Sequence, residues 1–242
     1  MPYCGSQTIA IATAGKAKAF PLRCRSWGCP TCAPMRRRRL IADGIAGAPN
    51  RFITLTVNPH WFGSPEERGL RLSRAWRDYV REFRRLHPRR ELQYLAVLEL
   101  TKKGEPHLHI VTRSGWIGQK ELSKHMAKAM GAPIVDIRQV RGQSEVASYV
   151  AKYISKRNIK LGKLKRYWMS QNYVLAAERE RRAAAKQHRA VWVIDVKMLE
   201  FRDLMTKMGF VIAAKGLEGI EWRMFDWEQK PPAYANYARR VR

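Results

Sequence analysis

Two histidines one residue apart are the first feature of this sequence that could do chemistry. They lie in Pro106-His-Leu-His109, within a run over 107–112 whose residue types predict a strand. Alternate side chains of a strand point to the same face, so the imidazoles of His107 and His109 would lie about 7 Å apart and could chelate one divalent ion. Glu99, on the preceding predicted strand 93–101, could add a carboxylate. If Thr101 lies opposite His107, then Glu99 lies opposite His109 on the same face. The alternative is that both histidines are ordinary residues of a half-buried strand.

A second group of reactive side chains lies on a helix that we predict to begin with Ser144 as its N-cap. Four residues fall at i, i+3, i+4 and i+7 and so share one face of that helix: Tyr149, Lys152, Tyr153 and Lys156. The apolar residues Val146, Val150 and Ile154 form a stripe that we expect on the opposite face, toward the core. The alternative is an amphipathic helix with an ordinary polar face.

A tyrosine hydroxyl can attack a phosphodiester and hold the phosphate covalently. With a pKa near 10, only about one part in a thousand of it is phenolate at pH 7. Neighbouring cations such as Lys152 and Lys156 would favour ionisation and hold the phosphate. A divalent ion would polarise a non-bridging oxygen.

The cysteines form a third candidate cluster, near the N-terminus: Cys4, Cys24, Cys29 and Cys32. Cys29-Pro-Thr-Cys32 has the spacing of a zinc knuckle, and four thiolates would complete a tetrahedral structural zinc site. Such a site would stabilise a module too small to fold on its own core. The alternative is a set of reduced structural thiols.

A basic run follows the cysteines and consists of Arg36, Arg37, Arg38 and Arg39. It could bind the DNA backbone, or it could be a solvated charged surface.

The elements that must position these residues can be read from periodicity and capping signals. In order they are a strand at 51–57, a helix at 64–87, strands at 93–101 and 107–112, a helix at 119–130 and a strand at 133–140. This is the split β-α-β order of ferredoxin-like α+β folds, with an antiparallel sheet and helices on one face. We therefore expect three segments: a cysteine-rich zinc module (1–48), a catalytic domain (49–160), and a basic, aromatic, mainly helical extension (161–242).

The composition favours a polyanionic partner. Lys and Arg number 47 against 20 Asp and Glu, a formal net charge of +27. Because neutralised phosphates release counterions, nucleic acid is the expected partner rather than a membrane. We find neither a transmembrane run nor a leader in Met1–Gly15, and four cysteines are too few for a secreted disulfide scaffold, so we expect a cytoplasmic protein.

Three of these segments together resemble the motifs of the HUH endonuclease superfamily, specifically rolling-circle replication initiators of small single-stranded DNA phages. They are Glu99, the strand Pro106–His109, and the helix Val146–Lys156; Phe52-Ile-Thr-Leu-Thr56 resembles the first-strand motif of the family. The resemblance implies a ferredoxin-like catalytic domain, a Mg²⁺ or Mn²⁺ ion, and cleavage that gives a 5′-phosphotyrosine and a free 3′-OH primer. The Tyr-x-x-x-Tyr pattern is similar to the two-tyrosine subgroup, in which the tyrosines are thought to alternate. Either tyrosine also fits the single-tyrosine form.

The implied partner is single-stranded DNA at a replication origin, together with a host polymerase. Because nothing in the sequence resembles a Gly-x-x-x-x-Gly-Lys-Ser/Thr loop, unwinding would need a host helicase. A relaxase or transposase would use the same site on another DNA. A zinc-containing nucleic-acid-binding protein without catalysis would explain the charge and the cysteines, but it would leave the other motifs to coincidence.

Overall fold

The computed structural model describes residues 4–13, 16–61, 63–155, 164–184, 190–194, 200, 203, 212–216, 219–223 and 238–240. Contacts divide the chain into two compact units, one formed by Met1–Pro34 with Arg181–Arg242 and the other by Met35–Glu180. The segments predicted from the sequence end instead at residues 48 and 160. The difference arises because strands from both ends of the chain pair in one sheet.

The first unit contains a six-stranded sheet in the order β11-β8-β1-β2-β10-β9. Its strands are β1 (Thr8–Thr13), β2 (Lys16–Pro21), β8 (Ala190–Ile194), β9 (Ile212–Gly216), β10 (Gly219–Arg223) and β11 (Ala238–Arg240). The expectation of a mainly helical extension is wrong for the described part of 161–242, which holds five strands and the helix α5 (Ala176–Ala184). Runs such as Ala-Val-Trp-Val-Ile of β8 are ambiguous alone, and here they become strands by pairing with β1.

The second unit contains an antiparallel sheet in the order β6-β3-β5-β4-β7. Its strands are β3 (Arg51–Leu55), β4 (Leu92–Leu100), β5 (Pro106–Ser114), β6 (Val135–Gln139) and β7 (Tyr167–Met169). Helix α2 (Pro65–Leu86) joins β3 to β4, and α3 (Gln119–Met130) joins β5 to β6. The predicted α+β fold, with its antiparallel sheet and split β-α-β order, is therefore confirmed.

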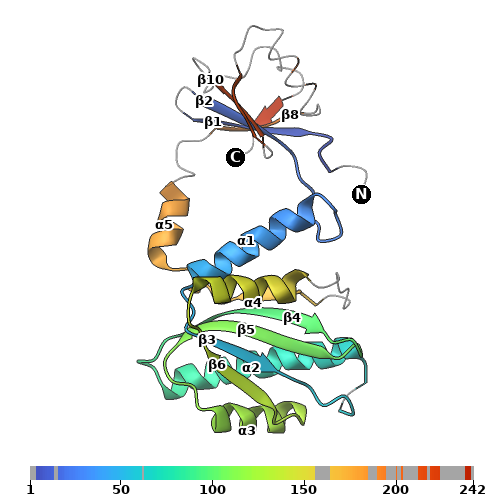
Figure 1. Ribbon diagram of the computed structural model, residues 1–242, viewed down its shortest axis with the longest axis vertical. Coiled ribbons are helices and arrows are strands. Elements are labelled where there is room, and N and C mark those ends of the chain that lie inside the picture. Colours follow the sequence, from blue (N-terminus) through green and yellow to red (C-terminus); the bar gives the residue numbers. More distant parts are fainter. Residues whose placement is uncertain are drawn as a thin grey trace. The chain divides into compact units, whose positions relative to one another are not determined.

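Helices cover both faces of this sheet, not one face as the sequence analysis expects. Helices α2 and α3 lie on one side, and α4 (Gln143–Ser155) lies on the other (Figure 1). The residues of α1 (Cys32–Ala46) that belong to this unit also pack near α4, since a Cβ on Gly44 would lie 3.1 Å from Val150. The position of α4 on the second face was not predicted, because the local sequence does not show on which side of a sheet a following helix packs.

Helix α2 illustrates how well local signals specify one element. The Ser64 side chain accepts a hydrogen bond from the Glu67 backbone N–H, and Pro65 occupies the first turn. The predicted stripe is buried along its whole length: Leu72, Trp76, Tyr79, Val80 and Phe83. The apolar layer between α2, α3 and the sheet is therefore the main core of the second unit.

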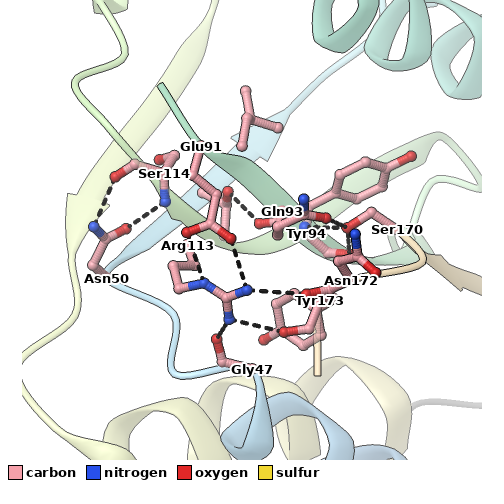
Figure 2. Close-up of polar contacts among 12 residues, drawn as sticks. Gly47, Asn50, Glu91, Gln93, Tyr94, Arg113, Ser114, Ser170, Asn172 and Tyr173 are labelled. Carbon is pink, nitrogen blue, oxygen red and sulfur yellow. Dashed lines mark hydrogen bonds and ion pairs between the residues drawn. The ribbon is translucent and has the colours of Figure 1, made fainter. Parts of the chain in front are cut away.

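Arg113 of β5 fastens the segment after β7 to the sheet (Figure 2). Its guanidinium pairs with Glu91 at 2.9 Å, and donates to the carbonyl of Tyr173 at 2.9 Å and to that of Gly47. A Cβ on Gly47 would lie 2.2 Å from the Tyr173 ring, so only glycine leaves room for the ring there. The region beside β4 is thus fixed by side chains from three parts of the unit.

Candidate metal and tyrosine site

The register of the sheet gathers polar residues on the face that α4 covers. Thr54 pairs with both His109 and Asp136 on its neighbouring strands, and Glu99 pairs with His107. The expected register, with Thr101 opposite His107, is therefore wrong by two residues. The reason is that Thr101 already closes the turn with the backbone of Glu105. A shift of two keeps every side chain on its face, so Glu99 still lies on the same face as both histidines.

A carboxylate and an imidazole meet in the interior of this face. Glu99 Oε2 lies 2.8 Å from His109 Nε2, and both side chains are only 6% exposed. The His107 and His109 rings have their centres 6.3 Å apart. A buried carboxylate needs a cationic partner, and one carboxylate with two imidazoles is a donor set suited to a divalent metal such as Mn²⁺. The structure thus brings Glu99 and His109 into contact, and His107 lies on the same face of the sheet beside them.

Both tyrosines of α4 contact His109. The Tyr149 hydroxyl lies 3.3 Å from His109 Nδ1 and 3.2 Å from Thr54 Oγ1. The Tyr153 ring stacks on the His109 ring, with centroids 3.4 Å apart. Burial raises the pKa of Tyr149, although its hydrogen bond with Thr54 acts in the opposite direction.

The tyrosines do not lie opposite the apolar stripe, as the sequence analysis expects. Val146, Tyr149, Val150 and Tyr153 are themselves at i, i+3, i+4 and i+7, so they share the side that packs on the sheet. Treating tyrosine as simply polar caused the error, because the ring is apolar and only the hydroxyl needs a partner. The helix also begins at Gln143, so Ser144 lies inside it and is not its N-cap.

One of the two predicted lysines lies among the described residues. Lys152 is exposed, and its Nζ lies 5.3 Å from the centre of the Tyr153 ring. This places one positive charge beside one phenol. Lys156 and the side chain of Ile154 fall outside the described residues.

Three further polar residues of the site were not singled out from the sequence. Thr54 contacts both His109 and Tyr149, and Asp136 pairs with Arg138 at 2.8 Å on the neighbouring strand β6. Smaller effects on the pKa of Tyr149 come from Asp136, which raises it, and Arg138, which lowers it. The i, i+2 spacing of Asp136 and Arg138 on a predicted strand was visible in the sequence. Only the strand register shows that this pair lies beside Thr54.

Two members of the predicted basic run turn toward residues at the edge of this sheet. Arg36 Nη2 lies 3.4 Å from the Tyr167 hydroxyl. Burial and the charge of Arg37 lower the pKa of Arg166, whose Nη2 lies 3.5 Å from the Tyr153 carbonyl. Arg38 and Arg39 are exposed, and Arg39 pairs with Asp43. The run is therefore divided between the sheet edge and solvent.

The four cysteines converge in the first unit. All four sulfur atoms lie within 4.8 Å of one another, and those of Cys4 and Cys32 are 3.4 Å apart. A tetrahedral zinc site with Zn–S bonds of about 2.3 Å requires sulfurs about 3.8 Å apart, which is close to this spacing. The backbone N–H of Cys32 lowers the pKa of the Cys29 thiol to about 6, whereas burial raises that of Cys32 to about 12. The predicted set Cys4, Cys24, Cys29 and Cys32 could thus hold a metal such as zinc.

Part of the chain that includes this site is similar to one known family. Residues 50–158 match the family model of replication-associated protein ORF2/G2P. This match covers β3 to α4 and therefore all the metal-ligand candidates of the sheet and both tyrosines. This part of the chain is therefore similar to a replication-associated family. No curated protein and no solved structure matches the chain.

The described helices include no candidate membrane span. None of those in the described part of the chain combines the length and the apolar character needed to cross a bilayer.

Proposed function

We propose that this protein is a metal-dependent, site-specific endonuclease and strand transferase of the HUH superfamily, two-tyrosine subgroup, which initiates rolling-circle replication on single-stranded DNA. The observation that carries the proposal is the position of His109. Its Nε2 contacts Glu99, its Nδ1 contacts the Tyr149 hydroxyl, and its ring stacks on Tyr153. One imidazole thus joins the metal-ligand candidates to both candidate nucleophiles.

Glu99, His107 and His109 would hold the Mg²⁺ or Mn²⁺ ion, which supplies a Lewis acid for a non-bridging oxygen of the scissile phosphate. Thr54 fixes the orientation of His109 through Nδ1, so that Nε2 remains directed at Glu99. The low exposure of Glu99 and His109 limits competition from water at this point.

The chemistry is a transesterification at phosphorus. A tyrosine oxygen forms a bond to phosphorus as the bond from phosphorus to the 3′ oxygen breaks, and the phenol proton passes to solvent. The departing 3′ oxygen takes up a proton and becomes the 3′-OH primer, while the phosphate stays on the tyrosine at the 5′ end. Attack by a 3′-OH on this phosphotyrosine reverses the step and joins strands, so no external energy source is needed.

We assign the first attack to Tyr153. The Tyr149 hydroxyl lies on the Nδ1 edge of His109, whereas Glu99 lies on the Nε2 edge, so Tyr149 is directed away from the ion. Tyr153 covers the ring itself and has the Lys152 charge beside it. Tyr149 would then orient His109 during the first cleavage and serve as the nucleophile of the second.

The test uses single-stranded oligonucleotides with a randomised central segment, labelled at the 3′ end, and the full-length protein with Mn²⁺. We expect a labelled covalent adduct on a denaturing gel, and a released 5′ fragment that a polymerase can extend. The double variant Tyr149→Phe/Tyr153→Phe should form no adduct but retain salt-sensitive binding. Each single variant should be partly active, with the larger loss for Tyr153→Phe.

Two results would overturn the proposal. An adduct that persists in the double variant would remove the tyrosines from the chemistry. Salt-sensitive binding by the wild-type protein without any adduct would instead favour a non-catalytic nucleic-acid-binding protein.

A further inference from the structure

A groove lies along α2, away from the tyrosine site. It has a volume of about 660 Å³. Its walls come from α2, from β4 and from the segment after β7, and they are formed by Arg74, Arg77, Asp78, Val80, Arg81, Arg84, Tyr94, Ser170 and Gln171. Ser170 is held in place because its Oγ accepts from the Tyr94 backbone N–H at 2.9 Å (Figure 2). The groove therefore has a fixed floor on the strand side.

The charge of this groove is strongly positive. Four arginines line it, and Asp78, the one acidic group among the described lining residues, already pairs with Arg81. Arg84 donates to the Leu92 carbonyl at 2.8 Å, and Arg77 donates to the Ser73 carbonyl at 3.2 Å. These bonds to neutral carbonyls hold guanidinium groups in place without cancelling their charge. Cations gathered in this way repel one another, so the groove is suited to a polyanion.

The spacing of the arginines matches a nucleic-acid backbone. Arg74, Arg77, Arg81 and Arg84 are at i, i+3, i+7 and i+10, so they follow one side of the helix over about 15 Å. One strand of B-form DNA carries about four phosphates over that axial distance. Tyr94, the only aromatic residue among those described in the lining, is 7% exposed and offers no free ring for base stacking. Contacts would therefore be to phosphates, as in duplex binding, rather than to unstacked bases.

We propose that the α2 groove binds the backbone of double-stranded DNA. Helix α2 lies on the opposite face of the sheet from α4 (Figure 1), so the groove and the tyrosine site contact different segments of DNA. Taking that duplex to be the one next to the nicked strand rests on the proposed function. The groove then holds the paired arm of an origin while the unpaired strand occupies the tyrosine site.

The test compares two variants with the same change of charge. Arg74→Gln/Arg77→Gln removes two arginines of the groove, and Arg85→Gln/Arg89→Gln removes two exposed arginines that are not part of its lining. Binding of a 20-base-pair duplex to the full-length protein is followed by fluorescence anisotropy between about 50 and 200 mM salt, the range over which phosphate contacts weaken measurably. Each lost contact lowers the log–log salt slope by about 0.9, so the groove variant should lose about 1.8. The control variant should lose much less.

Separate readouts distinguish this proposal from the proposed function. Tyr149→Phe/Tyr153→Phe should bind the duplex as the wild-type protein does, and Arg74→Gln/Arg77→Gln should still form adducts with short single strands. A groove variant with the salt slope of its control would overturn the groove proposal, whatever the adduct assay shows. A loss of affinity in the groove variant that is confined to single-stranded DNA would also overturn the groove proposal. If no adducts form but the groove variant loses salt slope as expected, only the proposed nuclease function is overturned.

Discussion

Replacing Thr54 with valine should weaken metal binding at the sheet while leaving the fold intact. Valine has nearly the size of threonine, so the change removes one oxygen that contacts His109 Nδ1 at 3.3 Å and the Tyr149 hydroxyl at 3.2 Å. Without that oxygen the imidazole is less firmly held with Nε2 toward Glu99. The effect on the ion would thus be transmitted through the orientation of a ligand.

The size of the effect on metal affinity depends on the contacts that His109 keeps in the variant. Loss of a partner that orients a ligating histidine generally reduces metal affinity by about 10- to 100-fold. The Tyr149 hydroxyl still lies 3.3 Å from the same nitrogen. For Thr54→Val we therefore expect a loss of metal affinity at the lower end of this range, about tenfold or about 1.4 kcal/mol. Thr54→Val/Tyr149→Phe, which removes both partners, should approach 100-fold.

The assay is titration of the zinc-loaded protein with Mn²⁺, with the free ion measured by electron paramagnetic resonance. Thr56→Val is the matched control, because Thr56 lies two residues further along the chain and its hydroxyl donates to the Ile134 carbonyl instead. An unchanged Mn²⁺ affinity in Thr54→Val, or an equal loss in Thr56→Val, would show that His109 is not oriented in this way.

Three further changes test other parts of the molecule. Glu105→Ala should lower the free energy of unfolding by about 3 kcal/mol in urea titrations, because it removes the carboxylate that Arg68, a side chain only 6% exposed, contacts at 2.8 Å. Arg71→Ala, at an exposed ion pair, should cost less than about 1 kcal/mol. Burial raises the pKa of Tyr79, so the stability that its neutral hydroxyl contributes is complete below the unfolded pKa of about 10 and falls at higher pH. Tyr79→Phe should therefore make the fall of the free energy of unfolding with pH shallower in urea titrations at several pH values. An unchanged dependence on pH would contradict this. Elemental analysis should find one zinc per wild-type chain and substantially less in Cys32→Ser, and a wild-type chain purified without zinc would refute the structural site.

Local sequence signals were sufficient to predict those elements whose formation depends mainly on their own residues. The cap at Ser64 and the spacing from Leu72 to Phe83 specify α2 completely, and the Gly131 stop of α3 has the left-handed conformation, with φ of 61°, that favours glycine. The grouping of Glu99 with the two histidines was also accessible, because a period of two survives a register error.

Nonlocal relations were not accessible. The face on which Tyr149 and Tyr153 lie depends on where α4 crosses the sheet, and Asp136 joins the site only because β6 pairs with β3. All four cysteines were predicted to form one metal site, but the pairing of β1 with β2, two strands that lie between Cys4 and Cys24 in the sequence, was not predicted. The groove on α2 needed the residues after β7, which lie outside the helix that carries its arginines.

The pairing of β1 with β8 has a consequence for how the chain is made. Thr8 lies opposite Ile194, so β1 cannot pair with β8 until nearly two hundred residues have been synthesised. The unit from Met35 to Glu180 is continuous in sequence and can close its own core earlier. During synthesis the β1–β2 hairpin therefore has two outer edges without their strand partners while the unit from Met35 to Glu180 can already fold.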